Sequence, residues 1–326
     1  MTPEIVAEIG ASHDGSLQRA LDTIAAAAEA GADAIKLQTW TPDTMDAGGR
    51  VLDSGPWKGM SLRDLYRKAW TPWEWHSELF AAARYLGMEA WSTPFDSGAL
   101  EFLEGLGCPR YKIASFELVD IPLIREVASK RKPVILSTGM ATSNEVDRAV
   151  RSALPNISIT LLCCVSAYPA SPKDYRLGLI TRLQRRHQVR VGLSDHTRGL
   201  TAPIAATALG ATMIERHISL GGDGLDDGYA SSPDEFAAMV RAVRETSESM
   251  GDMYGSARSE RQSLALRRSL WVVRDVKAGG VWAREDLVTA RPADGMHPSY
   301  LSAILGKPVT QDVASGSPMM GHYVRR

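Results

Sequence analysis

The chain has 326 residues, of which 44% are hydrophobic and 23% charged, a composition typical of a folded protein with a sizeable core rather than a disordered one. Lys and Arg number 37 against 38 Asp and Glu, so no overall basic charge favours binding to nucleic acid or to an anionic membrane. The start MTPEIVAEIG lacks a secretory pattern and no apolar run is long enough to span a bilayer, so we expect a cytoplasmic protein.

Eight short apolar runs rich in β-branched residues follow one another along the chain, separated by segments of helical period. One such helix, expected over residues 17–31, ends at a glycine that can adopt a left-handed C-cap. A doubly wound sheet would usually stop at about six strands and carry a glycine-rich phosphate turn after the first, which this chain lacks. The sequence therefore predicts an α/β fold, a (β/α)8 TIM barrel over residues 1–250. The expected strands are 4–10, 34–40, 89–95, 110–116, 133–139, 158–169, 189–197 and 212–219.

After residue 250 the chain changes character. The polar segment 251–267 is typical of a linker. Over residues 268–326, short apolar runs alternate with glycine turns, which predicts a compact β-rich module. A module of this size is too small to be very stable alone, so we expect it to pack on another surface.

Three cysteines, Cys108, Cys163 and Cys164, are present, and there is no CxxC motif. The adjacent pair could not form an unstrained disulfide. We expect reduced, structural thiols, with a catalytic cysteine as the alternative.

Polar residues stand at the ends of nearly all the expected strands. In a barrel, these C-terminal ends converge on one face, where reaction sites are built. Repetition on so many strands indicates a functional face rather than chance polarity. The residues are Glu8, Lys36, Gln38, Thr93, Lys112, Ser115, Ser137, Ser166, Tyr168, Ser194, His196 and His217.

His196 and His217 end the neighbouring seventh and eighth strands, so both imidazoles can face the barrel mouth. Glu8, Asp195 and Asp226 are nearby, either in sequence or in the expected barrel. Nitrogen, carboxylate and water ligands without a thiolate suit Mn2+, Co2+, Zn2+ or Mg2+. The pair therefore predicts a divalent metal site.

Lys36 and Lys112 end the second and fourth strands, beside the serines of the same face. Two ammonium groups and several hydroxyls are what a small ligand with a phosphate and a carboxylate needs, and phosphoenolpyruvate fits that description. A Schiff-base aldolase is the competing chemistry, in which one lysine is the nucleophile. The histidine pair argues against it, because such aldolases need no metal.

The segments AEIGASHDG, GADAIKLQTW, STPF, YKIAS, ILSTGMAT, SAYP, GLSDHT and IERHIS follow one another across the whole barrel. In order and spacing they resemble the hallmark blocks of the N-acetylneuraminate (sialic acid) synthase family. The segments LRDLYRKAWTPWEWHSELF and CPRYKIASFELVDIPLI most resemble its pseudaminic acid synthase branch. The tail, with TARPADGMHP and GKPVTQDV, is similar to the antifreeze-like SAF domain, a β-clip fold.

The resemblance implies a role for each matching position. His196 and His217 would be the metal ligands, with Mn2+ the expected ion, and Glu8 or Glu117 would direct a water molecule. The phosphoenolpyruvate contacts would be Lys36, Thr93, Lys112, Ser115, Ser137, Ser166 and Ser194. The sugar contacts would be Gln38, Phe95, Glu117, Tyr168, Asp226 and Arg291, the last from the SAF domain.

The resemblance also implies the reaction and the assembly. A metal-dependent enzyme would condense phosphoenolpyruvate with an open-chain N-acyl amino sugar and water, giving a nonulosonic acid and phosphate. The expected acceptor is a 2,4-diacetamido-2,4,6-trideoxy hexose. The alternatives are an N-acetylneuraminate or legionaminate synthase, a synthase with an atypical acceptor, and a non-catalytic sugar-binding homologue. The expected assembly is a domain-swapped homodimer whose SAF module covers the partner's barrel mouth and supplies Arg291.

The match departs from the family pattern after the strand-eight histidine. Here the run is HISLGGDGLDDGYASSPDEF, where Leu225 replaces an expected proline and SSP replaces LEP. Near the start, Ser12 and Asp14 stand where an NHN pattern is common. These changes lie at the sugar end of the expected site, so they concern the identity of the acceptor.

Overall fold

The computed structural model describes residues 2–46, 48–155, 157–222, 224–251 and 255–325. The chain divides into two compact units, Met1–Gly251 and Asp252–Arg326, each of which is described by itself. Within the described residues, no helix combines the length and the apolar content that crossing a bilayer requires.

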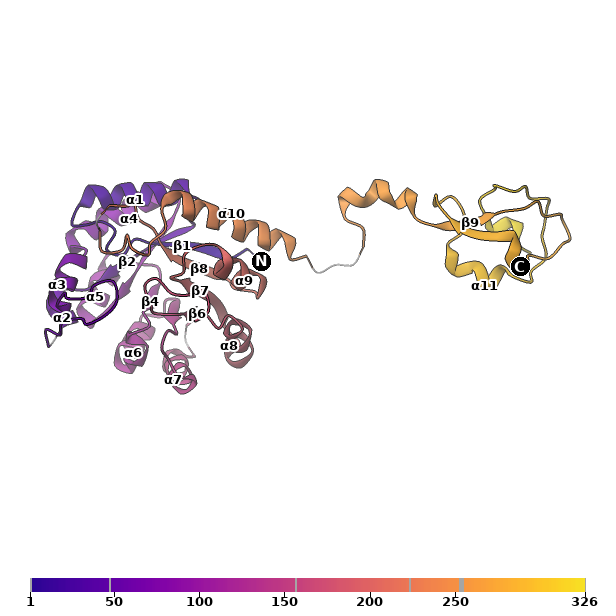
Figure 1. Ribbon diagram of the computed structural model, residues 1–326. Coiled ribbons are helices and arrows are strands. Elements are labelled where there is room, and N and C mark those ends of the chain that lie inside the picture. The colour runs from indigo at the N-terminus through magenta and orange to yellow at the C-terminus, as the bar shows by residue number, and fades with distance from the viewer. Residues whose placement is uncertain (1, 47, 156, 223, 252–254, 326) are drawn as a thin grey trace. The chain divides into compact units, whose positions relative to one another are not determined.

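The first unit is a closed barrel of eight parallel strands in sequence order, in which β8 pairs with β1 (Figure 1). All eight predicted strands are confirmed, and with them the barrel. Each is shorter than predicted, and two differ most: β4 covers only residues 111–113, and β6 ends at Cys164, where its pairing with β7 stops. Pro169 has no N–H for a ladder hydrogen bond, in keeping with the loop that follows β6. The strands are β1 Glu4–Glu8, β2 Ala34–Thr39, β3 Glu89–Pro94, β4 Tyr111–Ile113, β5 Val134–Ser137, β6 Ile159–Cys164, β7 Arg190–Asp195 and β8 Met213–His217.

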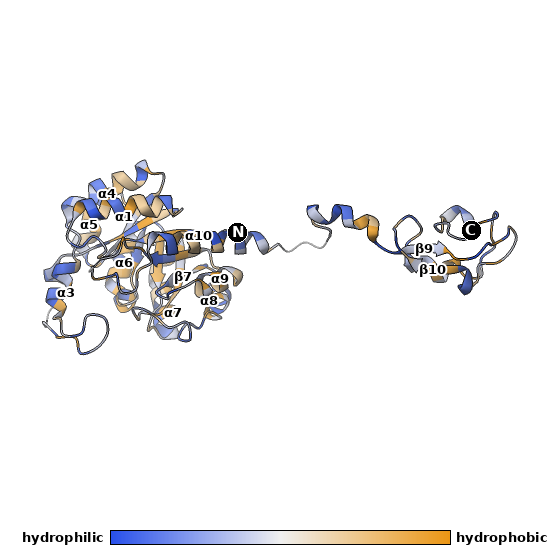
Figure 2. Cartoon of the chain, turned by 45° about the horizontal axis from the view of Figure 1, so that its top comes forward, coloured by the Kyte–Doolittle hydropathy of each residue, from blue (hydrophilic) through white to orange (hydrophobic). Residues whose placement is uncertain are grey.

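Helices surround the barrel, and their ends follow the expected capping chemistry. The Ser16 side chain accepts a hydrogen bond from the Arg19 backbone at the start of α1, and Gly31, just past its end, has φ +91° as predicted. Hydrophilic and hydrophobic residues alternate along these helices (Figure 2), so each can bury one face. The helices are α1 Leu17–Glu29, α2 Pro42–Met45, α3 Leu62–Ala69, α4 Trp73–Tyr85, α5 Ser97–Gly105, η1 Glu117–Val119, α6 Ile121–Ser129, α7 Ser143–Ala153, α8 Leu179–His187, α9 Thr201–Ala208 and α10 Pro233–Ser249.

Strand alternation decides which side chains enter the barrel. On β8, Glu215 and His217 line the cavity described below, whereas Arg216 between them forms an ion pair with Asp195 of β7. The barrel interior below the site is filled by buried apolar residues, which form one core with the inner faces of the helices. The strand ends are therefore held on a rigid frame.

The second unit is small and rich in extended structure. Strand β9 (Ser269–Val272) pairs antiparallel with β10 (Leu287–Ala290), and isolated bridges such as Val276 with Val313 add to them. Its own core includes Leu270, Trp282 and Met319. In the predicted linker 251–267, residues 252–254 lie outside the described part and residues 258–266 form the helical segment η2 (Arg258–Leu266). The remaining elements are η3 Arg284–Asp286, η4 Pro298–Tyr300, α11 Leu301–Ile304 and η5 Gly321–Tyr323.

Candidate active site

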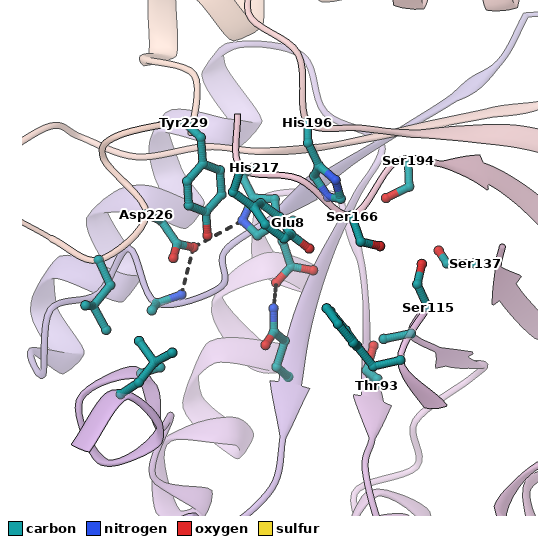
Figure 3. A pocket seen from close by; sticks show the side chains of 18 of the residues that line it. Glu8, Thr93, Ser115, Ser137, Ser166, Ser194, His196, His217, Asp226 and Tyr229 are labelled. Carbon is teal, nitrogen blue, oxygen red and sulfur yellow. Dashed lines mark hydrogen bonds and ion pairs between the residues drawn. The ribbon is translucent and has the colours of Figure 1, made fainter. Parts of the chain in front are cut away.

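A cavity of about 690 Å3 lies at the C-terminal ends of the barrel strands (Figure 3). Every predicted site residue of the first unit lines it. Arg291 belongs to the second unit, where its side chain is exposed, and its role stays a prediction. The predicted residues at the cavity are Glu8, Lys36, Gln38, Thr93, Phe95, Lys112, Ser115, Glu117, Ser137, Ser166, Tyr168, Ser194, His196, His217 and Asp226.

His196 and His217 face each other across the ends of β7 and β8, with ring centroids 5.6 Å apart. Nδ1 of His196 bonds to the Val165 carbonyl at 2.7 Å, and Nδ1 of His217 bonds to Asp226 at 3.1 Å. Among the described residues, the hydrogen bonds of both rings use Nδ1 and leave Nε2. Metal-binding histidines are typically oriented in this way by a carbonyl or a carboxylate.

Burial lowers the pKa of His217 although Asp226 opposes the effect, so a neutral imidazole is favoured, as a metal ligand requires. Within the described part of the chain, no three His, Cys, Asp or Glu side chains are grouped to hold a metal ion. The two imidazoles, whose Nδ1 atoms are bonded to Val165 and Asp226, suit a metal with water or substrate oxygens as its other ligands.

Asp195 does not join this site. The residue before His196 directs its carboxylate away from the cavity, where it pairs with Arg216 at 2.9 Å and accepts a hydrogen bond from the Thr197 backbone. Strand alternation is the reason, since neighbouring residues of β7 face opposite sides. Asp195 is thus adjacent to His196 in the sequence, as expected, but is not among the residues that line the cavity.

Asp226 holds the loop after β8 against the loop after β1. Its carboxylate accepts a hydrogen bond from the Ala11 backbone at 3.0 Å as well as facing His217, and the Tyr229 side chain points toward it (Figure 3). Gly10 has φ +49°, and a Cβ there would collide with this carboxylate. The glycine of the AEIGASHDG segment thus permits the close approach of the two loops.

The two lysines of the site are both paired with buried carboxylates. Lys36 forms an ion pair with Glu8, which also accepts hydrogen bonds from the Gly10 backbone at 2.8 Å and from Gln38 at 3.1 Å. Lys112 forms an ion pair with Glu215. The lysine pair predicted for an anion is therefore present, but each member is already neutralised by an acid.

Glu215 was not among the predicted site residues. It accepts a hydrogen bond from the Ser194 hydroxyl at 3.2 Å in addition to its ion pair with Lys112. Its place two residues before His217 on a strand was the available signal, because residues two apart share a face. Burial would raise its pKa, but Lys112 and Lys36 reverse this and hold it low, so the carboxylate stays charged.

The pKa of Lys36 is lowered as well, but for a lysine a lower pKa favours the neutral form. Burial lowers its pKa to about 7, and this outweighs the attraction of Glu215. An anion that reaches Lys36 would favour the charged ammonium and bring its pKa back up. The cavity thus contains a lysine whose charge depends on what is bound.

Four serine hydroxyls gather on one side of the cavity, Ser115, Ser137, Ser166 and Ser194, while Asp226 and Tyr229 lie on the other (Figure 3). The Ser137 oxygen is buried and has no hydrogen-bond partner among the described residues. Leaving such a group unsatisfied costs about 1 to 3 kcal/mol, which a polar ligand would relieve.

Glu117 lies on η1 at the edge of the cavity, partly buried. Burial raises its pKa to about 7, and its Oε2 atom has no partner within the described residues. It can therefore exchange a proton near neutral pH.

The cysteines are all free, as expected, but they differ in place. Cys108 and Cys163 are buried, which agrees with a structural role, whereas Cys164 lines the cavity with its sulfur 4.0 Å from Nδ1 of His196. Burial would raise the pKa of Cys164, but His196 lowers it to about 7. Cys164, Tyr229 and Trp57 are thus further residues of the cavity that sequence reasoning missed.

A closed (β/α)8 barrel with lysines, carboxylates and histidines at its mouth is typical of an enzyme. The chain belongs to the NeuB family, whose model matches residues 23–254. The SAF domain model matches residues 267–324, where the sequence predicted such a module.

Named relatives resemble the chain along nearly its whole length. Pseudaminic acid synthase of Helicobacter pylori is 39% identical over 99% of this chain and 98% of its own. N,N'-diacetyllegionaminic acid synthase of Legionella pneumophila is 33% identical over 99% of this chain and 95% of its own. The crystal structure of N-acetylneuraminic acid synthetase from Leptospira borgpetersenii in complex with citrate is similar with a TM-score of 0.73 and 29% identity, over 81% of this chain and 90% of that one.

Proposed function

We propose that the chain condenses phosphoenolpyruvate with an open-chain N-acyl amino sugar and water, giving a nonulosonic acid and phosphate. Membership of the NeuB family and the named synthases among its relatives support the proposal. The observation that carries it is the cavity itself, where the lysine and serine side lies next to the histidine pair. The lysine and serine side suits phosphoenolpyruvate, and the histidine pair suits the aldehyde of the sugar.

Phosphoenolpyruvate would bind against Lys36, Lys112 and the serine hydroxyls, with Thr93 beside Lys36 at 3.4 Å. The unpartnered Ser137 hydroxyl would donate to a phosphate or carboxylate oxygen. Glu8 and Glu215 pair with the two lysines and hold their amino groups at the strand ends. An anionic ligand would favour the charged form of Lys36, whose pKa burial lowers to about 7.

His196 and His217 would hold a divalent ion, for which Mn2+ is our expectation. When bound, such an ion supplies Lewis acidity toward the aldehyde oxygen of the acceptor. The chain contributes the orientation of both rings through Val165 and Asp226. Gln38 and Tyr168, which also line the cavity, would position the sugar.

In the reaction, the C2–C3 π electrons of phosphoenolpyruvate form a bond to the aldehyde carbon, whose C=O π bond breaks and whose oxygen takes up a proton to become a hydroxyl, while positive charge develops at C2. Water adds at C2, and the C2–O bond to phosphate then breaks as the keto acid forms. Glu117 suits the role of accepting the water proton, because its pKa is about 7 and its Oε2 has no hydrogen-bond partner in the described part of the chain. Glu8 suits a holding role, since it is bound to Lys36, Gln38 and Gly10.

The proposed acceptor is a 2,4-diacetamido-2,4,6-trideoxy hexose. The pseudaminic acid synthase of Helicobacter pylori is more similar to the chain than the legionaminic acid relative is, at 39% against 33% identity. N-acetylmannosamine-type and other atypical acceptors are the competing choices, and the test compares them directly.

A homodimer in which the second unit of one chain supplies Arg291 to the partner's cavity is part of the proposal, as is a cytoplasmic location. Arg291 is exposed and its planar guanidinium suits a sugar amide or hydroxyl. Refolding an Arg291→Ala chain together with a His196→Ala chain would restore activity if the site is shared in trans.

One observation favours a second candidate, a Schiff-base aldolase. Burial gives Lys36 a pKa of about 7, a property of nucleophilic lysines. Borohydride reduction in the presence of substrate separates the two chemistries, because only the aldolase traps a lysine adduct. Phosphate release from phosphoenolpyruvate, dependent on an amino sugar, tests the main proposal.

A further inference from the structure

The connection between β2 and α4 forms one wall of the cavity and is mostly apolar. Residues 50–62 fold back on themselves, with an antiparallel bridge between Val51 and Ser61 and a hydrogen bond from the Leu52 backbone to Met60 at 3.0 Å. This hairpin and the adjoining helices contribute aliphatic and aromatic side chains rather than charges. The larger apolar contributors are Trp40, Met45, Leu52, Pro56, Trp57, Leu62, Leu65 and Tyr66, and Ser54 is a polar lining residue of the same connection.

Three aromatic rings from three different connections meet beside this wall. The ring centroids of Trp57 and Tyr168 are 5.8 Å apart, those of Trp57 and Tyr229 6.2 Å, and those of Tyr168 and Tyr229 4.8 Å. We call Trp57, Tyr168 and Tyr229 the aromatic triad. All three line the cavity, so they are not simply part of the barrel core.

Trp57 is fixed to the segment that departs from the family pattern. Its indole nitrogen donates a hydrogen bond to the Leu225 carbonyl at 3.3 Å, and the Leu225 residue also lines the cavity. Because its only N–H is used in this bond, Trp57 offers a ligand an apolar ring and no donor. Leu225 and Trp57 together therefore form an apolar corner.

The aromatic triad begins at the reacting end of the cavity. Tyr168 lies 4.3 Å from His196 and Tyr229 lies 5.1 Å from His217, between ring centroids, whereas Trp57 lies beyond them. An acceptor with its aldehyde at the histidines would extend its carbon chain along these rings. Its substituents far from the aldehyde would then reach Trp57 and Leu225.

We propose that Trp57 and Leu225, with the rings of Tyr168 and Tyr229, form a subsite for a methyl group of the acceptor and so select a deoxy, N-acylated sugar. This inference rests on the proposed function and names its specificity-determining residues. A methyl group at C6 or on a 4-acetamido group is stabilised by contact with the rings. A hydroxyl at the same place loses its water and finds no partner on Trp57.

The experiment compares two acceptors on one enzyme: a 2,4-diacetamido-2,4,6-trideoxy hexose and N-acetylmannosamine, which carries hydroxyls at C4 and C6. For Trp57→Ala we expect kcat/KM for the trideoxy sugar to fall about tenfold or more, the effect of losing contacts to one small apolar group. We expect less than threefold change for N-acetylmannosamine and an unchanged KM for phosphoenolpyruvate. Tyr85→Ala, which alters an aromatic residue of α4 that is 91% exposed, is the control and should change none of these values.

An equal loss with both acceptors for Trp57→Ala would overturn the subsite and show a structural role. Leu225→Asn, which keeps the volume but places a polar amide in the corner, gives a second reading if Trp57→Ala folds poorly. It should also reduce the preference for the trideoxy sugar, and an unchanged preference would contradict the inference.

The proposed function can fail separately. If the unaltered enzyme releases no phosphate with either sugar, the function is wrong, and calorimetric titration with the trideoxy sugar then tests the subsite alone. Weaker binding to Trp57→Ala by about tenfold, with none of that loss in Tyr85→Ala, would still support the subsite. Equal binding to Trp57→Ala and the unaltered protein would reject it.

Discussion

Lys112 of β4 and Glu215 of β8 form an ion pair inside the barrel mouth, with both side chains buried. The Ser194 hydroxyl adds a hydrogen bond to the carboxylate. The pair joins two strands that are not neighbours in the sheet, and it places an ammonium group beside the serine side of the cavity. We therefore expect the Lys112–Glu215 ion pair to contribute both to stability and to ligand binding. Substitutions can measure these two contributions separately.

Lys112→Met is expected to lower stability as well as weaken phosphoenolpyruvate binding. It leaves Glu215 buried and unpaired, which costs about 3 to 5 kcal/mol in free energy of unfolding. The double variant Lys112→Met with Glu215→Gln should recover most of that stability, because no buried charge is left. It should still bind phosphoenolpyruvate more weakly by at least ~1.5 to 3 kcal/mol, the range for a hydrogen bond to a charged group.

Denaturant unfolding and calorimetric titration measure the two effects separately. Recovery of phosphoenolpyruvate binding in the double variant would show that Lys112 acts through the fold and does not contact the ligand. Lys36→Met should weaken binding by a similar amount, and unchanged binding in both lysine variants would place the phosphoenolpyruvate site elsewhere.

Phosphoenolpyruvate binding should weaken as pH rises above 7. Lys36 has a pKa of about 7 in the free protein, lowered by burial, so it is charged below that pH and increasingly neutral above it. An anionic ligand raises this pKa, so binding above pH 7 takes up a proton. The dissociation constant should then rise by up to about tenfold per pH unit between 7 and 9.

Titration calorimetry at pH 8 in buffers of different ionisation enthalpy reports the proton uptake directly. Lys36→Arg is the matched control, because arginine stays charged throughout. Equal slopes for the native protein and Lys36→Arg would mean that another group titrates.

The histidine pair should bind a divalent metal without the aid of other protein ligands. His196→Ala or His217→Ala should abolish tight Mn2+ binding and turnover while leaving the melting temperature of the metal-free protein almost unchanged. Asp226→Asn should retain metal but bind it about 10- to 100-fold more weakly, because it orients His217 without being a ligand. Calorimetric titration with Mn2+ measures the affinities, and unaltered affinity in both alanine variants would contradict the assignment.

Glu117 should set a pH dependence of turnover that is separate from that of Lys36. As the proposed base it must be deprotonated, so kcat should rise through a pKa of about 7. Glu117→Gln should lower kcat and remove that rise.

Ionisation of Glu117, which is expected to increase kcat, is expected to lower the stability of the folded protein. Burial raises the Glu117 pKa above its unfolded value, so the folded state loses stability as pH increases from the unfolded pKa towards 7. Glu117→Gln should therefore raise the melting temperature at pH 8 more than at pH 4. In the turnover measurement, if kcat of Glu117→Gln still rises with pH through about 7, Glu117 is not the group responsible for that rise.

The fold and much of the cavity were predictable because both depend on local periodicity. Eight strands with polar ends identify a barrel mouth, and Lys36, Lys112 and His217 follow from that pattern. Glu215 could have been found by the same period of two, since it lies one step below His217 on β8. Asp195 shows the limit, because its place next to His196 in the sequence does not tell on which side of β7 its carboxylate lies.

Trp57 could not be placed from the sequence. It lies in a long connection, and its position depends on a hydrogen bond to Leu225, 168 residues further along the chain. Cys164 was similarly ambiguous, because the end of β6 decides whether its thiol faces the core or the cavity, and that end was predicted too far along. Loops take their positions from tertiary contacts, which residue periodicity does not encode.

Phosphate release from phosphoenolpyruvate tests the central claim most directly. The Mn2+-loaded protein would be mixed with phosphoenolpyruvate and, in separate reactions, a 2,4-diacetamido-2,4,6-trideoxy hexose, N-acetylmannosamine or no sugar, and inorganic phosphate and the nine-carbon keto acid would be measured together. We predict equal amounts of phosphate and keto acid with the trideoxy sugar, less with N-acetylmannosamine, and none without an acceptor. Binding of the sugars with no phosphate released under any of these conditions would contradict the account.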